Sequence, residues 1–233
     1  MKSYLEPIDV SKLFETAINS RDQLLVLTIF RLGCRISEAL AIGIDDIDFT
    51  NGTVTIKHLK SRIKLKCPDC KAALNLTTIF CPACGVKVES AVQEIKDVRR
   101  QRILPLEDKL IGLIKKFVSS GGPVERNGRL MLFGINRHRA WQIVKNLAEK
   151  AGLPKIINLE TGKIHSVSPH KLRDAFAVNA MKHDDSGDGM RMLQEHLGHA
   201  SFNTTAKYRK IAGEEHRKWY QELWTDSVNG PGN

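Results

Sequence analysis

Four cysteines in two closely spaced pairs are the feature that most restricts how this chain can fold. Cys67 and Cys70 form one Cys-x-x-Cys pair, and Cys81 and Cys84 form a second pair after ten intervening residues. Two such turns can place four thiolates around one tetrahedral metal ion. Disulfides or free thiols are the alternatives, and a reducing compartment disfavours disulfides. The pattern predicts a structural zinc ribbon at residues 67–87, holding one ion with no coordination position left for catalysis.

The ribbon interrupts two predicted strands. β-branched residues alternate along residues 53–59, directly after an Asn51-Gly52 turn. Residues 99–106 predict a second strand that ends at a proline. We therefore expect the ribbon at the tip of this hairpin. Its first half is crowded with basic residues, which either contact DNA or form a solvated charge run: Lys60, Arg62, Lys64, Lys66 and Lys71.

Most of the remaining chain has the apolar periodicity of helices. The sequence contains no internal repeat and no low-complexity tract. Helices with one small sheet predict an α+β fold. The predicted helices span residues 8–20, 22–33, 35–42, 107–119, 137–150, 170–182, 190–199, 203–210 and 214–224.

The chain is strongly basic. Lysine and arginine total 36 and aspartate and glutamate total 26, which gives a net charge of +10 and a pI near 9.4. A polyanion such as nucleic acid fits this charge, although a soluble protein can also be simply basic. The longest apolar run, residues 24–30, is too short to cross a membrane, and the first ten residues lack a signal peptide's apolar segment. We expect a cytoplasmic protein with no membrane partner, associated with the nucleoid when bound to DNA.

Five polar residues have the types and spacing that a phosphate site needs. His170 and Arg173 lie three residues apart at the start of a predicted helix, so both can face one anion. Arg35 starts another predicted helix, and two arginines can bind the oxygens of one phosphate. Tyr208 follows His199 by nine residues, and its hydroxyl is a nucleophile only where cations favour its anion. Each residue alone is more typical of a surface ion pair or a packed side chain.

Three segments resemble the conserved motifs of tyrosine recombinases, the phage integrase family: RLGCRISEALAIGIDDID, SPHKLRDAFAVNAMKHD and LQEHLGHASFNTTAKYRKI. The resemblance extends over residues 8–212, which match the family's catalytic domain. Lys60 fits best as the family's lysine on a strand hairpin, and Lys57 and Lys96 compete with it because the ribbon blurs the alignment. The residues that match the family's catalytic positions are Arg35, Lys60, His170, Arg173, His199 and Tyr208.

The resemblance implies a site-specific recombinase or integrase that breaks and rejoins DNA. Tyr208 would attack a scissile phosphate, giving a 3′-phosphotyrosyl bond and a free 5′-hydroxyl without ATP or a catalytic metal. Arg35 and Arg173 would neutralise the charge that develops on the phosphorane oxygens. Lys60 would protonate the departing 5′-oxygen. Viral genome integration, movement of a mobile element and resolution of chromosomes or plasmids all fit this chemistry.

The resemblance also implies assisting groups and an assembly. His170 would accept the tyrosine proton, and His199 would hydrogen-bond a phosphate oxygen. The partner is double-stranded DNA. Four protomers of the family act on two duplexes, so we expect a homotetramer on DNA and a monomer when free.

The domain organisation follows from the same resemblance. We expect a catalytic domain at residues 1–66 and 88–212, the inserted ribbon at 67–87, and a C-terminal helix and tail at 213–233. Trp219, Tyr220 and Trp224 lie on that helix, which would pack on its own core or dock on a neighbouring protomer. Most family members carry an N-terminal DNA-binding domain that this sequence does not include. Asp174 stands where the family frequently has histidine.

Three other functions compete with recombination. The first is a regulatory DNA-binding protein that has lost activity, which the complete set of catalytic candidates disfavours. The second is a type IB topoisomerase, which shares the tyrosine chemistry and would relax supercoiled DNA. The third is a zinc-dependent nuclease, whose cleavage a chelator would inhibit.

Overall fold

The computed structural model describes residues 2–57, 62–75, 77–96, 101–158 and 161–211. The chain divides into two compact units, one containing residues up to Ile56 and from Arg102 onward, the other containing Lys57–Gln101. The predicted ribbon, residues 67–87, lies inside the second unit. The predicted C-terminal helix and tail at 213–233 lie outside the described residues. No helix in the described ranges is long and apolar enough to span a membrane.

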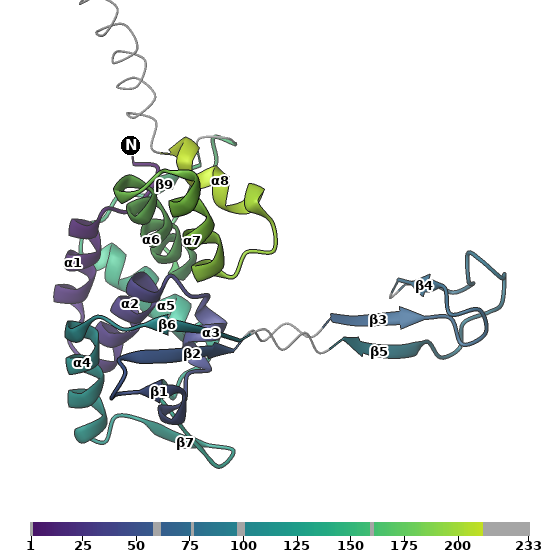
Figure 1. Cartoon of the computed structure of the whole chain (residues 1–233), viewed down its shortest axis with the longest axis horizontal. Helices are drawn as coiled ribbons and strands as arrows, with labels where there is room; N and C mark the ends of the chain where they lie inside the picture. The colour runs from purple at the N-terminus through teal and green to yellow at the C-terminus, as the bar shows by residue number, and fades with distance from the viewer. Residues whose placement is uncertain (1, 58–61, 76, 97–100, 159–160, 212–233) are drawn as a thin grey trace, which may run out of the picture. The chain divides into compact units, whose positions relative to one another are not determined.

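The first unit is mainly helical, with short antiparallel strand pairs (Figure 1). The α+β prediction is confirmed. The helices are α1 (Pro7–Thr16), α2 (Ser20–Leu32), α3 (Ile36–Leu40), the 3-10 turn η1 (Ile44–Asp46), α4 (Asp108–Ser119), α5 (Arg137–Lys150), α6 (Pro169–His183), α7 (Gly187–Leu197) and α8 (Phe202–Ile211). The strands are β1 (Ile47–Asp48), β2 (Thr53–Lys57), β6 (Gln101–Pro105), β7 (Val124–Arg126), β8 (Arg129–Met131), β9 (Ile156–Ile157) and β10 (Ile164–His165).

The first two helices end and begin at identifiable caps. The helix predicted at residues 8–20 is wrong beyond Thr16, because the Asn19 side chain accepts a hydrogen bond from the Asp22 amide at 2.8 Å and starts α2. Helix α2 ends at Gly33, whose φ of 53° is left-handed. A Cβ at this position would also collide with the ring of Phe176 on α6. Glycine is therefore required here for its conformation and for close packing of α2 against α6.

A three-stranded sheet in the order β1-β2-β6 supports this unit. β1 and β2 are antiparallel, with Ile47 opposite Val54. Val54, Ile56 and Leu104 are buried in the main core. The strand that ends at a proline, predicted at residues 99–106, is thus present as β6 and leads directly into α4.

Two further strand pairs lie between the helices, outside the two strands that the sequence predicts. β7 and β8 form a hairpin whose turn, Asn127-Gly128, has φ values of 52° and 72°. Asn-Gly is the preferred pair for such a turn, so this hairpin had a readable signal. β9 and β10 also pair antiparallel, with Ile157 opposite Ile164.

Helices α6, α7 and α8 pack together at one end of the first unit (Figure 1). Their shared apolar cluster includes Val178, Met181, Leu193, Leu197 and Tyr208. This cluster is separate from the main core. Helices α2 and α6 pack directly against each other and both contribute residues to the main core. The C-terminal helices therefore form a layer of their own, and Tyr208 is one of its buried members.

The second unit contains a three-stranded antiparallel sheet in the order β4-β3-β5. Its strands are β3 (Arg62–Lys66), β4 (Ala73–Leu74) and β5 (Val92–Lys96). Lys66 pairs with Val92 at one end of the β3–β5 ladder, directly before Cys67. The two cysteine pairs thus lie in the connections that follow β3 and precede β5.

Candidate active site and metal centre

The four paired cysteines of the second unit form one cluster. Their sulfur atoms all lie within 4.8 Å of one another. The Cys67–Cys84 and Cys70–Cys81 sulfur distances are 3.6 and 3.5 Å. Tetrahedral zinc with Zn–S bonds of about 2.3 Å separates its sulfurs by about 3.8 Å. The cluster therefore fits one tetrahedral ion, and all four positions come from cysteine.

Both cysteine turns have the same backbone geometry. The Lys71 amide donates to the Cys67 carbonyl at 3.2 Å, and the Gly85 amide donates to the Cys81 carbonyl at 2.9 Å. Lys71 and Gly85 each follow the second cysteine of a pair, with left-handed φ values of 61° and 73°. The amides of Cys84 and Ala83 lower the pKa of the Cys81 thiol to about 6. Backbone donors thus favour the Cys81 thiolate, the form that binds metal, whereas hydrogen bonds with the neighbouring thiols raise the pKa of Cys84 to about 12.

In the first unit, Arg35 is part of a network centred on Glu38. The Arg35 amide and Nη1 donate to the two oxygens of Glu38, both at 2.9 Å. Arg102 on β6 donates from Nη2 to Glu38 Oε2 at 2.7 Å. The Glu38 side chain is 1% exposed. Burial alone would raise its pKa, but the hydrogen bonds from Arg102 and Arg35 lower it to about 2. Glu38 is therefore an anion that joins two cations.

Arg173 is buried where two helices end. Its Nη1 donates to the carbonyl of Gly33 at 2.6 Å, and its Nη2 donates to the carbonyl of Leu197 at 2.9 Å. The C-terminal carbonyls of α2 and α7 thus fix the guanidinium in place. Burial and the charge of Arg35 lower the pKa of Arg173, yet an arginine stays protonated at neutral pH.

His199 connects Arg173 to helix α8. Its Nε2 lies 2.9 Å from Arg173 Nη2, and its Nδ1 lies 2.9 Å from Thr205 Oγ1. Because a guanidinium can only donate, we assign Nε2 as the acceptor and place the ring proton on Nδ1. Burial and the charge of Arg173 lower the His199 pKa to about 4. His199 is consequently neutral at physiological pH, with its N–H directed at Thr205.

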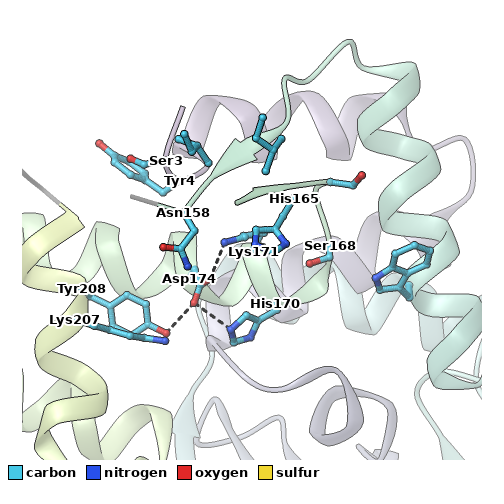
Figure 2. A pocket seen from close by; sticks show the side chains of 14 residues that line it. Ser3, Tyr4, Asn158, His165, Ser168, His170, Lys171, Asp174, Lys207 and Tyr208 are labelled. Carbon is cyan, nitrogen blue, oxygen red and sulfur yellow. Dashed lines mark hydrogen bonds and ion pairs between the residues drawn. The ribbon is translucent and has the colours of Figure 1, made fainter. Parts of the chain in front are cut away.

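Tyr208 projects from α8 and is 1% exposed. Its hydroxyl donates to Asp174 Oδ1 on α6 at 2.9 Å (Figure 2). Its ring is nearly parallel to that of His199, with centroids 6.3 Å apart. Burial raises the pKa of Tyr208, and the charge and hydrogen bond of Asp174 raise it further. The hydroxyl is thus fully protonated at neutral pH.

His170 lies one helical turn before Asp174 on α6. Its side chain is 65% exposed, and its Nε2 lies 3.6 Å from Asp174 Oδ1. His170, Asp174 and Tyr208 line a cavity of about 530 Å³ together with Lys171 and Lys207 (Figure 2). The sequence predicts that His170 and Arg173 can both face one anion. In the structure Arg173 is directed at two helix ends, whereas His170 faces the cavity.

The structure leaves the choice of lysine open. Lys60 lies outside the described residues. Lys57 is the last residue of β2, and Lys96 is the last residue of β5, opposite Arg62. No arrangement of a lysine with Arg35 or Arg173 is therefore assigned.

Two residues of the network around Arg35 are missing from the sequence-based set. Glu38 follows Arg35 by three residues, the spacing at which a glutamate returns to a helix N-terminus. That spacing was a usable signal. Arg102 is 64 residues from Glu38 in the chain, and its side chain is 14% exposed. Only the tertiary fold brings these two side chains together.

Comparison with known proteins identifies the family of this chain. The model of the phage integrase family matches residues 3–81 and 84–215. Tyrosine recombinase XerD of Neisseria meningitidis serogroup B is 26% identical over 206 residues, covering 85% of this chain and 53% of that protein. Tyrosine recombinase XerA of Pyrococcus horikoshii is 22% identical over 218 residues, covering 90% of this chain and 57% of that protein.

Solved recombinase structures share the fold. The crystal structure of XerA recombinase superposes with a TM-score of 0.61 at 19% identity, covering 94% of this chain and 63% of that one. XerH bound to its palindromic difH substrate, in a post-cleavage complex, gives 0.62 at 20% identity, covering 96% and 53%. The chain spans about half the length of the recombinases it matches. Since the family model matches most of its residues, the chain belongs to the phage integrase family.

Proposed function

We propose that this chain carries the catalytic part of a site-specific DNA recombinase or integrase that acts through a 3′-phosphotyrosyl intermediate. The observation that carries the proposal is the connected set Arg173–His199–Tyr208, placed by α6, the α7–α8 turn and α8. Arg35, at the start of α3, belongs to the same set, since its positive charge acts to lower the pKa values of Arg173, His199 and Tyr208. Membership of a family whose relatives are named tyrosine recombinases supports the same chemistry.

Cleavage would be an in-line displacement at one phosphate. A bond forms between the Tyr208 oxygen and phosphorus as the bond from phosphorus to the 5′-oxygen breaks. Arg35 and Arg173 would hold the non-bridging oxygens and neutralise their growing charge. A lysine, for which we keep Lys60, would give the leaving oxygen its proton. The phosphodiester energy stays in the tyrosyl bond, so strand joining is the reverse step.

The two histidines would assist at different stages. His170, exposed to the cavity beside Tyr208, would accept the phenolic proton. His199 would donate to a phosphate oxygen. With its proton on Nδ1 toward Thr205, this requires His199 to exchange its acceptor contact with Arg173 for a proton on Nε2. We infer that DNA binding drives this exchange, because a phosphate offers Arg173 a better partner than a neutral ring.

The second unit would hold one structural zinc ion and contact DNA. Cys67, Cys70, Cys81 and Cys84 would bind the ion, which supplies folding energy to a unit whose buried apolar residues, where burial is described, are Cys67 and Cys81. Residues 57–101 contain ten lysines and arginines and four aspartates and glutamates, a net +6 of the chain's +10. Zinc with four thiolates adds a charge of about −2, which leaves the unit basic. This concentration of charge favours contact with the backbone of double-stranded DNA.

The assembly and the division into domains belong to the same proposal. The catalytic domain comprises residues 1–66 and 88–212, and the ribbon comprises residues 67–87. Four protomers would act on two duplexes, with the C-terminal segment, residues 213–233, contacting a neighbouring protomer. The chemistry needs neither ATP nor a catalytic metal.

The test is capture of the covalent intermediate. DNA pools with a nick near random sequence trap the adduct, because the cut end diffuses away and religation fails. The wild-type protein should form a covalent adduct that resists chelator, and the peptide attached to DNA should contain Tyr208. Tyr208→Phe should abolish the adduct and keep DNA binding, whereas Tyr4→Phe and Tyr220→Phe should retain both. An adduct formed by Tyr208→Phe would refute the assignment.

The same experiment separates the competing functions. A regulatory protein without activity would bind DNA and give no adduct. A topoisomerase would relax supercoiled plasmid without dependence on sequence. A zinc nuclease would release free ends, and a chelator would stop it.

A further inference from the structure

Asp174 is an acidic residue inside an otherwise basic site. It lies on α6, directly after Arg173, and its side chain is 13% exposed. Its Oδ1 accepts the Tyr208 hydroxyl at 2.9 Å, and the same oxygen lies 3.6 Å from His170 Nε2. Its Oδ2 lies 3.7 Å from Lys171 Nζ. Figure 2 shows these three side chains meeting on one carboxylate.

The charges that surround this carboxylate come from several elements. Helix α6 contributes His170, Lys171 and Arg173 beside it, and α8 contributes Lys207, whose Nζ lies 4.7 Å from the centre of the Tyr208 ring. Further titratable groups near Tyr208 are Arg35 at the start of α3, His165 on β10, His199 between α7 and α8, and Tyr4, which lines the same cavity. Among the described residues that line the cavity, Asp174 is the one acidic side chain.

We propose that Asp174 is a positioning residue that holds the Tyr208 hydroxyl in a resting state and withholds it from DNA until a phosphate takes over the neighbouring cations. This inference rests on the proposed function of Tyr208. The carboxylate gives the buried hydroxyl an anionic partner in a cavity whose other charged or basic lining residues are His165, His170, Lys171 and Lys207. A phosphate that binds Lys171 would remove a cation that fixes the carboxylate and would bring a negative charge beside it, so the carboxylate would turn away from Tyr208 and leave the hydroxyl to His170.

The same 2.9 Å contact also suits a different role. An Asp174 that accepted the phenolic proton during attack would be a general base, and its loss would slow cleavage. If Asp174 instead holds the hydroxyl, its loss should have the opposite effect on the cleavage rate. Without the charge of Asp174, the pKa of Tyr208 should fall and its hydroxyl should be held less strongly, so cleavage should become faster. The direction of the rate change therefore decides between the two roles.

The test of this role uses Asp174→Asn, which keeps the shape and the acceptor oxygen but removes the charge. Asp188→Asn is the matched control, since Asp188 is 90% exposed on α7 and pairs only weakly with Arg191 at 3.9 Å. Single-turnover adduct formation on nicked DNA is measured at several pH values. We expect Asp174→Asn to cleave about tenfold faster at neutral pH, the effect of a charge-assisted hydrogen bond weakened by about 1.4 kcal/mol. Its pH–rate profile should shift to lower pH, and the control should match the wild type.

A second measurement reports on the contact without activity. The chain has three tyrosines, so NMR of protein labelled with ¹³C at tyrosine Cζ gives few signals. The signal that disappears in Tyr208→Phe is that of Tyr208. The Tyr208 signal should titrate at lower pH in Asp174→Asn than in wild type. An unchanged titration, or slower cleavage with DNA binding intact, would overturn the proposal. If the titration shifts but wild type forms no adduct, the holding contact stands and the recombinase function fails.

Discussion

Replacing Glu38 with glutamine would remove the negative charge between two arginines while keeping the side chain's size. The Glu38 side chain is 1% exposed, and the Arg102 side chain that it binds is 14% exposed. Arg102 also has a buried Nε without a hydrogen-bond partner among the described residues. Glutamine can accept some of the same hydrogen bonds, but it leaves Arg102 and Arg35 close together without a compensating anion. The variant should therefore fold less stably.

The magnitude follows from the pKa of Glu38. The hydrogen bonds from Arg102 and Arg35 outweigh its burial and bring this pKa from 4.5 to about 2. Since one pKa unit corresponds to about 1.4 kcal/mol, the ionised form stabilises the fold by about 3 kcal/mol. Breaking a buried ion pair by removing one partner typically costs about 3–5 kcal/mol. We expect Glu38→Gln to lower the free energy of unfolding by about 3 kcal/mol.

The assay is urea unfolding of the zinc-loaded protein, followed by circular dichroism. Glu107→Gln is the matched control, because the Glu107–Arg31 pair joins side chains that are both 44% exposed. That variant should lose less than about 1 kcal/mol. The contribution of Glu38 is fully present above pH 4.5 and is lost as the pH falls through about 2. The reasoning is refuted if both variants lose the same stability, or if the deficit of Glu38→Gln does not shrink in acid.

Three further predictions concern separate features. Cys84→Ser should reduce bound zinc, measured by atomic absorption, whereas Cys34→Ser should keep it. Gly33→Ala should cost more than about 2 kcal/mol in thermal unfolding, and Gly121→Ala, also left-handed but open, about 1 kcal/mol. Stability should fall as the pH drops from 6.5 toward about 4, because His199 must stay neutral to accept from Arg173, and His199→Gln should flatten this slope.

Local patterns predicted the helices and turns of this chain better than its long-range contacts. The glycine that ends α2 and the strand that ends at Pro105 were readable because one or two residues determine each of them. The β7–β8 hairpin lies outside the predicted strands, although its Asn127-Gly128 turn is a standard hairpin signal. The break between the first two helices was predicted at residue 21, but α1 already ends at Thr16 and Asn19 caps α2, because apolar periodicity continues past Thr16.

In the candidate site, too, the residues themselves were predictable from local patterns, whereas their long-range contacts were not. Motif spacing predicts Arg35, His170, Arg173, His199 and Tyr208 as catalytic candidates, because the resemblance to a family places each one individually. It could not reveal that Arg173 binds two helix-end carbonyls, since these depend on how α2 and α7 pack. The holding contact from Asp174 to Tyr208 spans 34 residues and two helices, and it was visible in the sequence only as an unusual residue after an arginine.

The described site would suit a resting state, because its candidate arginines and Tyr208 already have internal partners. Arg35 binds Glu38, Arg173 binds backbone carbonyls and His199, and the Tyr208 hydroxyl binds Asp174. A buried charge or hydroxyl without a partner would destabilise the fold by several kcal/mol, on the order of its whole margin. Internal partners remove that cost while no DNA is bound. Under the proposed function, a phosphate that enters would exchange these contacts for its own, so binding and activation would become one event and Tyr208 would be exposed only where DNA is present.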